Sequence, residues 1–433
     1  MDERERRLIE IHVPILARVE GEGALEFTAR DGKIKDLKLR IYEPPRFFEK
    51  FFEGRLYSDI PDLVARICGI CPVAYQMSAV QAFENALGVQ VSPWVHRMRR
   101  LFYCGEWIQS HALHIHLLAA PDFLGHDSVI GLASEYPEEV RRGMRLQNLG
   151  NRIVQLVGAR SVHPVGARVG GFHHAPSRQE AKLLGEQLEQ ELPQAEALVG
   201  WTASLDLPGQ EQDFVSVALH HPEKYPMYDG RILSREGLDI EISTFQDYFT
   251  EHQVPHSTAL HSTLQGKTYM VGPLARMNLN WDRLDQAVQR AVLATDVRFP
   301  SRNIFHSIVA RAAEINQAMI EAADLLQTYE HEDEPFVTVQ PGAGTGMGCT
   351  EAPRGILWHR YDLDEQGRVR KAVIIPPTSQ NQARIEEDLR QSFENYGLYH
   401  SDNELRAHGE TVIRNYDPCI SCATHFLKLK VRR

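Results

Sequence analysis

Apolar and polar side chains alternate along residues 9–42, a period of two that is typical of β-strands. Glycine-containing turns at 21–23 and 31–32 divide this stretch, which therefore predicts a β-meander. Farther along the chain, apolar side chains recur every three to four positions, the period of an amphipathic helix. The helices predicted in this way cover residues 72–87, 93–120, 137–158, 178–199 and 281–328.

The helix expected over 72–87 has recognisable ends. Pro72 suits a first helical position, because proline lacks the N–H that is unpaired there in any helix. Gly88 suits the left-handed residue that often follows a helix. Cys71 immediately precedes this helix, where free N–H groups and the helix dipole favour a thiolate.

Short strands mixed with glycine, proline and histidine predict an irregular lobe over 206–276, and 335–375 is predicted to form strands around a glycine-rich turn. No repeat or clear linker divides the chain, so we expect a single α+β domain. Its core is predicted to be large and mainly helical, a helix bundle with peripheral β-rich lobes. The expected parts of the domain 1–433 are a meander (1–60), a helical core (61–205), an irregular α/β lobe (206–276), and helices with a C-terminal β segment and cysteine motif (277–433).

Composition excludes several classes of protein. The 433 residues include 47 Lys and Arg against 58 Asp and Glu, and this acidic balance argues against a nucleic-acid partner. No run of 18 apolar residues exists, so no membrane span is expected. The charged start MDERERRLIEIHV lacks the apolar stretch of a secretory signal, and we expect a cytoplasmic protein.

Four of the six cysteines form two C-x-x-C pairs, Cys68 with Cys71 and Cys419 with Cys422. A disulfide framework is not expected in a long chain without an export signal. This spacing is the usual grip on a soft metal, because both thiolates can face one point. Spacing alone leaves open a structural zinc site closed by four sulfurs, or a different metal centre.

The residues around the pairs favour the second interpretation, since a zinc knuckle does not require Arg66, Asp417 or His425 at fixed offsets. Further distinctive segments lie between the pairs and before them. The motifs in order are 18–21 (RVEG), 46–55 (RFFEKFFEGR), 66–72 (RICGICP), 158–164 (GARSVHP) with 170–171 (GG), 351–355 (EAPRG), 377–381 (PTSQN) and 417–425 (DPCISCATH).

Together these motifs resemble the large subunit of a nickel–iron hydrogenase, and the likeness extends from residue 18 to residue 425. The resemblance implies that fold, and the reaction H2 ⇌ 2 H⁺ + 2 e⁻. It also implies nickel held by four thiolates, with Cys68 and Cys419 as terminal ligands. Cys71 and Cys422 would bridge nickel to an iron that carries one carbon monoxide and two cyanides.

The resemblance also assigns residues near the metals. Glu20 matches the carboxylate that relays a proton from Cys419; the alternative is a solvated turn residue. Arg354 would lie over the metals and donate to a cyanide; the alternative is a surface salt bridge.

Three further residues would surround the same site. Pro353 would form part of the apolar pocket around the iron ligands. Thr378 would donate to the second cyanide. Asp417 would orient Arg354 or the cysteine turn, although Asp-Pro is also a common turn starter.

A second metal position is implied near the C-terminus. Glu49, His425 and the backbone carbonyl of Ile374 match the residues that bind a separate magnesium or iron ion. Magnesium prefers oxygen ligands and water, so the imidazole leaves the identity of this ion open.

Three positions depart from the family. Tyr75 stands where many members have histidine, so we expect hydrogen bonding to the bridging sulfur to differ. Ser110 stands where many have an aspartate near the site, so that carboxylate is missing, and Ser379-Gln380 replaces the common Thr-Trp, where we expect a difference in packing only. His111, His114 and His116 share one predicted helix, and we expect core or interface histidines rather than metal ligands.

The remaining cysteines bear on partners. Cys104 and Cys349 are expected to be buried, and two thiols cannot hold an iron–sulfur relay, so electrons must leave through another subunit. The family pairs this chain with an iron–sulfur small subunit. The cysteine motifs most resemble the NADP-linked sulfhydrogenase group, which adds flavin, NAD(P) and ferredoxin-like electron-transfer subunits. The glycines of 342–348 match no nucleotide-binding loop, and we expect close backbone packing there.

Two alternatives stay open at this stage: a nickel-free scaffold related to the quinone-side subunit of respiratory complex I, and a structural zinc protein. The resemblance also raises cleavage of residues 426–433 by a maturation protease.

Overall fold

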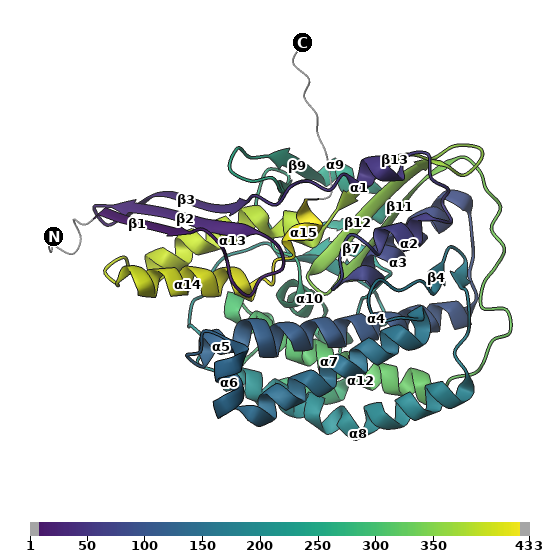
Figure 1. Ribbon diagram of the computed structural model, residues 1–433, viewed down its shortest axis with the longest axis horizontal. Helices are drawn as coiled ribbons and strands as arrows, with labels where there is room; N and C mark the ends of the chain where they lie inside the picture. The colour runs from purple at the N-terminus through teal and green to yellow at the C-terminus, as the bar shows by residue number, and fades with distance from the viewer. Residues whose placement is uncertain (1–7, 425–433) are drawn as a thin grey trace, which may run out of the picture.

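The computed structural model describes residues 8–424, and Figure 1 shows how their helices and strands are arranged. The N-terminal meander forms as expected: Asp31 and Gly32, both with positive φ, turn the second strand into the third. The strands are β1 (Leu8–Val13), β2 (Gly23–Arg30), β3 (Lys33–Ile41), β4 (Ala167–Arg168), β5 (Gly171–Phe172), β6 (Val217–His220), β7 (Arg231–Ser234), β8 (Asp239–Ile240), β9 (Phe249–Gln253), β10 (Leu260–Leu264), β11 (Gly344–Ala352), β12 (Gly355–Leu363) and β13 (Val369–Ile375).

Helices dominate the rest of the chain, so the α+β class with a mainly helical core is confirmed. The α-helices are α1 (Phe48–Phe52), α2 (Ile60–Val64), α3 (Pro72–Leu87), α4 (Pro93–Leu113), α5 (Ala120–Phe123), α6 (Val129–Glu135), α7 (Pro137–Gly158), α8 (Arg178–Ala203), α9 (Phe245–Tyr248), α10 (Pro273–Asn280), α11 (Gln286–Leu293), α12 (Ser307–Gln327), α13 (Pro377–Tyr396), α14 (Asp402–Asn415) and α15 (Ile420–Ala423). Shorter turns are η2 (His114–Ala119, a π-helix), η3 (Ile242–Thr244), η4 (Trp281–Arg283) and η5 (Ile304–His306).

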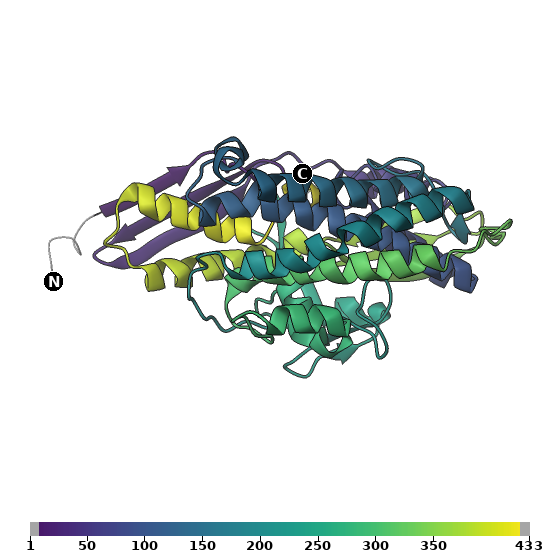
Figure 2. The ribbon, with the colours of Figure 1, turned by 90° about the horizontal axis from the view of Figure 1, so that it is seen from below.

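Helices α4, α7, α8 and α12 pack lengthwise into the bundle, which Figures 1 and 2 show from two sides. Their starts follow from sequence: the Ser92 side chain caps α4, and Ser177 with Glu180 forms a capping box at α8. Glycines let α4 and α7 cross closely, since a Cβ at Gly150 would lie 2.6 Å from the carbonyl oxygen of Gly105. Helix α4 of this bundle also contacts the start of α3, the helix that Cys71 precedes, because Glu106 accepts the N–H groups of Val73 and Ala74.

Helix α3 lies directly on β11, the first strand of the antiparallel sheet β11–β12–β13. A Cβ at Gly346 would lie 1.9 Å from the carbonyl oxygen of Ala82, and one at Gly348 would lie 2.1 Å from that of Ser78. The close packing expected for these glycines is thus confirmed. They belong to strand β11, however, so the expectation of a glycine-rich turn was wrong: alternate glycines give a strand one flat face.

The helix expected over 281–328 was also wrong as a continuous element. It is broken into η4, α11 and α12, with a loop over 294–303. Asp285 starts α11 by accepting from the Ala287 N–H, and Pro300 in the loop cannot continue a helix. Asn303 accepts from the Phe305 N–H and starts the next turn. The prediction followed the apolar periodicity alone and did not use these local signals for the start and end of helices.

The stretch 206–276 carries two small sheets, β6–β7–β8 and β9–β10, with a hydrophobic cluster of their own that also includes Trp358 from β12. In Figure 2, segments coloured teal to green project from one side of the bundle. No helix within residues 8–424 is long and apolar enough to cross a membrane.

Candidate metal centre

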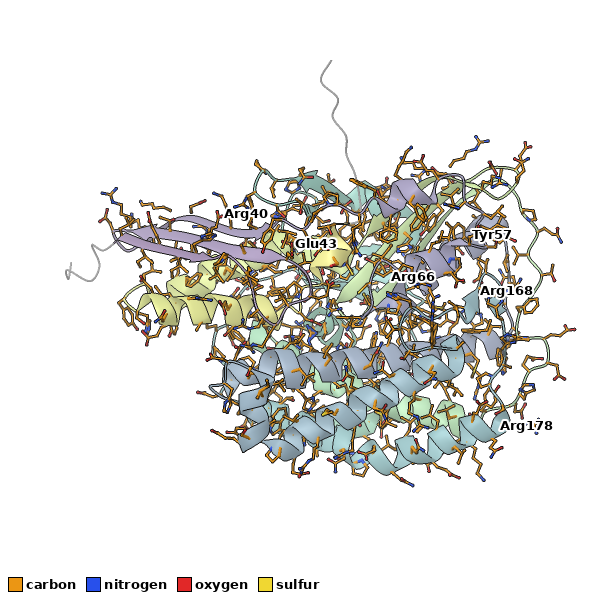
Figure 3. All side chains as sticks on the ribbon, in the orientation of Figure 1. Arg40, Glu43, Tyr57, Arg66, Arg168 and Arg178 are labelled. Atoms are coloured by element: carbon orange, nitrogen blue, oxygen red, sulfur yellow. The ribbon has the colours of Figure 1, made fainter. Side chains whose placement is uncertain are left out.

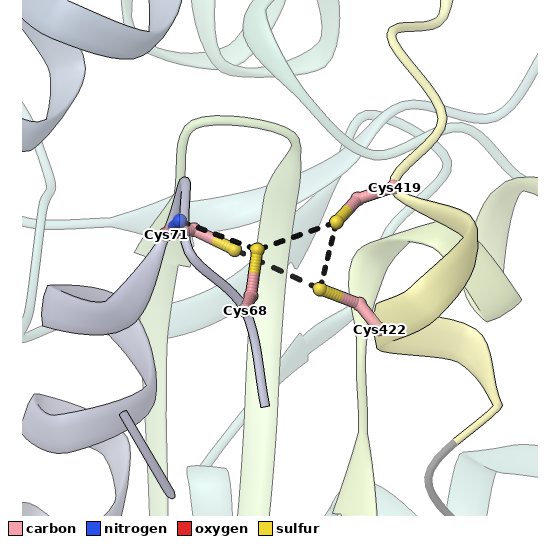
Figure 4. A group of neighbouring side chains, drawn as sticks. All are labelled: Cys68, Cys71, Cys419 and Cys422. Atoms are coloured by element: carbon pink, nitrogen blue, oxygen red, sulfur yellow. Dashed lines mark hydrogen bonds between the residues drawn. The ribbon is translucent and has the colours of Figure 1, made fainter. Parts of the chain in front are cut away.

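Four cysteine sulfurs meet inside the molecule, although they come from distant parts of the sequence (Figure 4). The Sγ atoms of Cys68 and Cys419 lie 3.4 Å apart, those of Cys71 and Cys422 3.8 Å, and those of Cys419 and Cys422 2.9 Å. All four side chains are buried. The two pairs therefore form one site rather than two half-sites.

Local backbone geometry aims both pairs at one point. Cys71 is the residue before α3, and Cys419 is the residue before the short turn α15. Asp417, with φ of 54°, bends the chain into that turn. The Ile420 N–H donates to the carbonyl oxygen of Glu20 at 2.9 Å. The C-terminal pair is thus fastened to the segment just before β2.

The four thiols do not ionise alike. Hydrogen bonds from Cys419, Cys422 and Cys71 lower the pKa of Cys68, and the positive charge of Arg354 acts in the same direction. The backbone N–H of Cys71 also donates to Cys68 Sγ at 3.4 Å. Burial raises the pKa of Cys419 and of Cys422. A cluster of buried sulfurs, one of them easily ionised, suits a soft cation that displaces the remaining protons.

Glu20 contacts this cluster directly. Its Oε2 atom lies 3.1 Å from Cys419 Sγ and accepts the N–H of Ser421 at 3.1 Å. The side chain is half-buried, so one carboxylate joins a sulfur to the outer part of the protein. A carboxylate solvated in a turn does not describe this arrangement.

Arg354 and Asp417 form a buried pair at the same site. Arg354 donates through Nε to the carbonyl oxygen of Asp417 at 2.6 Å and through Nη2 to its Oδ1 at 2.9 Å. Both side chains are at most 3% exposed, which rules out a surface salt bridge. Burial alone would raise the pKa of Asp417, but the charges of Arg354, His114 and Arg311 and the hydrogen bond from Arg354 together lower it.

This pair is left incomplete. Arg354 Nη1 and Asp417 Oδ2 are buried and have no hydrogen-bond partner among residues 8–424. Buried polar atoms are nearly always satisfied, so an open donor beside four thiols indicates a bound group with acceptors of its own. A metal whose additional ligands carry acceptor atoms, such as cyanide, fits that requirement.

Thr378 and Pro353 are also buried at or near this site. The Cys419 N–H donates to Thr378 Oγ1 at 3.0 Å, so this hydroxyl accepts and can still donate its own proton elsewhere. The carbonyl oxygen of Pro353 accepts from Arg276 at 3.1 Å, which fixes the backbone just before Arg354.

Two of the three residues expected at the separate magnesium or iron site lie together. The Ile374 N–H donates to Glu49 Oε1 at 2.7 Å. His425, the third, lies outside the described residues.

Sequence reasoning missed Arg46, which clamps the two cysteine turns together. Its guanidinium donates to the carbonyl oxygen of Ile67 at 2.7 Å and also to that of Ser421. Glu43 lies beside α15 (Figure 3) and accepts the Ser421 hydroxyl at 3.1 Å. Arg46 is the first residue of the motif 46–55, but only the fold shows that it contacts both cysteine turns.

Glu106 was missed as well. It is fully buried in α4 and accepts the N–H groups of Val73 at 2.6 Å and Ala74 at 3.1 Å. Burial raises its pKa well above the usual range, against the effect of those two bonds. The signal in the sequence is an acidic residue within a long apolar helical stretch. In the structure, Glu106 fixes the first turn of α3.

A second buried arginine, Arg276, binds segment 351–355, to which Arg354 belongs. Arg276 donates to both oxygens of Glu314 at 2.7 Å each, and to Glu351 Oε2 and the Ala352 carbonyl oxygen at 2.9 Å each. His111 completes the group, 2.9 Å from Glu314. Burial raises the pKa of Glu351 to about 7, and the charge of Arg276 limits that rise.

The remaining expectations concern single residues. His111, His114 and His116 are all buried, as expected of core histidines, and so are Cys104 and Cys349. Tyr75 is buried near the cysteines: burial, then the charges of Cys422 and Cys71, raises its hydroxyl pKa well above the usual value. Ser110 is buried in α4.

The family profile described as nickel-dependent hydrogenase matches residues 46–140 and 243–425, more than half of the chain. The chain belongs to this family. It is the catalytic large subunit of a nickel–iron hydrogenase, an oxidoreductase that acts on H2. The family and the activity on H2 that the motifs implied are confirmed, and the nickel-free scaffold and structural zinc interpretations are not favoured.

Relatives of this hydrogenase subunit agree over nearly the whole chain. The sulfhydrogenase 1 subunit alpha of Pyrococcus furiosus is 34% identical, covering 97% of this chain and 99% of its own. The subunit beta of the NAD-reducing hydrogenase HoxS of Cupriavidus necator is 30% identical, covering 95% and 94%.

Solved structures of hydrogenases share the fold of this chain. The chain superposes on an NAD⁺-reducing [NiFe]-hydrogenase in the H2-reduced state with a TM-score of 0.87 and 27% identity, covering 96% of this chain and 99% of that one. A [NiFeSe]-hydrogenase of Dm. baculatum, 22% identical with a TM-score of 0.76 over 97% of this chain and all of its own, shares the fold.

Proposed function

We propose that Cys68 and Cys419 bind nickel as terminal ligands, and that Cys71 and Cys422 bridge it to an iron with one carbon monoxide and two cyanides. The observation that carries this proposal is the group of four buried sulfurs, all within 4.8 Å of one another. When bound, this cofactor supplies the redox centre at which H2 is split into protons and electrons.

In this proposal Glu20 moves the proton. Its Oε2 receives the proton from Cys419 Sγ, 3.1 Å away, and releases it toward the surface, because the carboxylate is only half-buried. Ser421 keeps the carboxylate in place through its backbone N–H.

Arg354, Thr378, Pro353 and Asp417 hold the iron side. The open Nη1 of Arg354 donates to one cyanide, and Asp417 fixes the guanidinium in that orientation. The Thr378 hydroxyl donates to the second cyanide while it accepts the Cys419 N–H. Pro353 adds a buried apolar wall.

Electrons leave through another subunit. The relatives are named as subunits of larger hydrogenases, which supports pairing with an iron–sulfur small subunit. The name NAD-reducing hydrogenase supports NAD(P) as the electron acceptor. Flavin and ferredoxin-like subunits on that route stay a prediction from the resemblance of the cysteine motifs. A cytoplasmic location and removal of residues 426–433 by a maturation protease stay predictions.

Metal analysis and infrared spectroscopy of the purified complex test the metal assignment. We expect one nickel per chain, with bands from carbon monoxide and cyanide. Cys419→Ser should lose nickel and hydrogen uptake, while Cys104→Ser, a buried cysteine outside the site, should keep both. Full nickel loading of Cys419→Ser would contradict the assignment.

Isotope exchange tests Glu20. Glu20→Gln should keep nickel and the infrared bands but lose most H/D exchange activity, since the amide cannot take up the proton. Glu22→Gln changes an exposed neighbour and serves as the matched control. Unchanged exchange in Glu20→Gln would remove this residue from the proton route.

We also propose that Glu49, the Ile374 carbonyl and His425 bind a magnesium or iron ion. The contact between Glu49 and Ile374 supports it. Glu49→Gln should lose one magnesium or iron per chain, whereas the more exposed Glu53→Gln should not.

A further inference from the structure

A second group of possible metal ligands lies where the loop 254–259 and strand β10 meet helix α13. His256, His261 and Glu386 each offer one ligand atom, and these atoms lie within 4.8 Å of one another. Glu386 lies eight positions after Thr378, about 12 Å along α13, so this group is separate from the cysteine site. We propose that these three residues bind a divalent transition-metal ion, Zn²⁺ by its ligand chemistry.

Hydrogen bonding alone does not account for this group. His256 Nε2 lies 2.7 Å from Glu386 Oε1, which explains two of the three side chains. His261 is 3% exposed, yet its Nε2 has no hydrogen-bond partner in the described part of the chain. A buried imidazole nitrogen without a hydrogen-bond partner binds a metal ion in the tautomer that places its lone pair there.

Two imidazoles and one carboxylate suit Zn²⁺, which binds such donors at about 2.0–2.2 Å and leaves a fourth position for water. Tetrahedral bonds of that length place neighbouring donor atoms about 3.3 Å apart, so the contact between His256 and Glu386 must open by several tenths of an ångström on binding. Both side chains are about one-fifth exposed, 20% and 19%, which leaves room for that movement and a way in for the ion.

The surroundings favour a metal over a proton. Burial lowers the pKa of His261 to about 4, and the charges of His256 and His252 act in the same direction, so its imidazole is neutral near pH 7. The Leu39 N–H donates to Glu386 Oε1 at 2.9 Å and orients the carboxylate. A bound ion would thus join β10 and α13 next to strand β3.

Zinc uptake by the nickel-loaded complex tests the proposal. After equilibrium dialysis against micromolar Zn²⁺, the wild type should hold one zinc per chain more than Glu386→Gln, whose amide oxygen can still accept from Leu39. His256→Gln should also hold one zinc per chain less at this concentration, because its affinity for Zn²⁺ should be at least tenfold weaker than that of the wild type. His173→Gln, an exposed histidine elsewhere, should bind zinc as the wild type does.

X-ray absorption at the zinc edge separates this site from the cysteines. We expect a shell of nitrogen and oxygen near 2.0 Å and no sulfur near 2.3 Å. Equal zinc content in wild type and both variants, or a sulfur shell, would overturn the proposal, as would a wild type that takes up no zinc. The last result would mean that water fills the space beside His261.

Discussion

Two buried arginines meet at segment 351–355: Arg354 belongs to it, and Arg276 binds its first three residues. They differ in how far their hydrogen bonds are satisfied. Arg276 faces Glu314 and Glu351, and all three of its nitrogens donate. Arg354 faces Asp417 and the cysteines, and its Nη1 has no hydrogen-bond partner within residues 8–424. The contrast teaches that one arginine holds the fold together, whereas the other is held in place for a ligand.

The largest effect is expected from breaking the group of Arg276, Glu314, Glu351 and His111, called the closed group below. Arg276→Ala leaves Glu314 and Glu351 buried without their cation, which should cost about 3–5 kcal/mol of stability. Thermal unfolding of the purified complex measures this loss. Arg302→Ala is the control, because Arg302 pairs with Asp213 at the surface and should change stability by less than about 1 kcal/mol. Similar midpoints for both variants would refute the role given to Arg276.

The open arginine should respond differently. Arg354→Lys keeps the positive charge beside Asp417 but loses the planar group that can reach both Asp417 and a ligand. We expect hydrogen oxidation to fall at least about 100-fold, with a stability loss of only about 1–2 kcal/mol. The cyanide bands in the infrared should shift as well. Unshifted bands would show that Nη1 does not donate to cyanide.

The pH dependence of stability should differ between the closed group and a buried histidine outside it. Burial lowers the pKa of His111 and of His116 to about 4, so both stay neutral in the folded chain while they bind a proton in the unfolded chain below about pH 6.5. Each therefore contributes stability that is present above pH 6.5 and lost as pH falls toward 4. Glu351, with its pKa raised to about 7, has the opposite effect. The stability that it contributes is present below about pH 4.5 and is lost as pH rises to about 7.

Within the closed group His111 and Glu351 offset each other, whereas His116 lies outside it. His116→Gln should thus reduce the loss of stability between pH 7 and pH 5 by about 2 kcal/mol. Thermal midpoints at both pH values measure it, and the exposed His174→Gln should keep the wild-type difference. An unchanged difference in His116→Gln would contradict its neutral burial.

The smallest effect is expected at Tyr75. Tyr75→Phe keeps the ring and removes a buried hydroxyl near Cys71 and Cys422, so stability should change by less than about 1 kcal/mol. A shift of the infrared bands, without loss of nickel, would show that this hydroxyl acts on the bridging sulfurs. Its absence would leave Arg354 and Thr378 as the donors at the site.

Sequence predicted the parts of the fold that depend on local signals. Helix α3 begins at Pro72 and is followed by Gly88 in the left-handed conformation, as the sequence indicated. The breaks between η4, α11 and α12 were missed, because the prediction followed apolar periodicity past the capping signal at Asp285 and past Pro300. The flat face of β11 follows from its alternating glycines, but a turn and a strand can both use glycine.

The candidate site divides in the same way. The four cysteines could be predicted because their spacing and neighbours are distinctive. The role of Arg46 could not, since it acts through backbone atoms of other segments. Glu106 is marked in the sequence only by its place within a long apolar helical stretch, which does not indicate that it binds the N–H groups of Val73 and Ala74. The contact of Arg46 with Ser421, for example, spans 375 positions. Such contacts leave no mark in a single sequence, and the group around His261 is of the same kind.

The distance along the chain between the two cysteine pairs has a consequence for synthesis. Cys68 and Cys419 are 351 positions apart, so at roughly 5–20 residues per second the first pair leaves the ribosome about 20–70 s before the second. During that interval Cys68 and Cys71 have no opposing sulfurs. Any nascent chain therefore passes through a stage at which the thiols of the first pair are present and those of the second have not yet been translated.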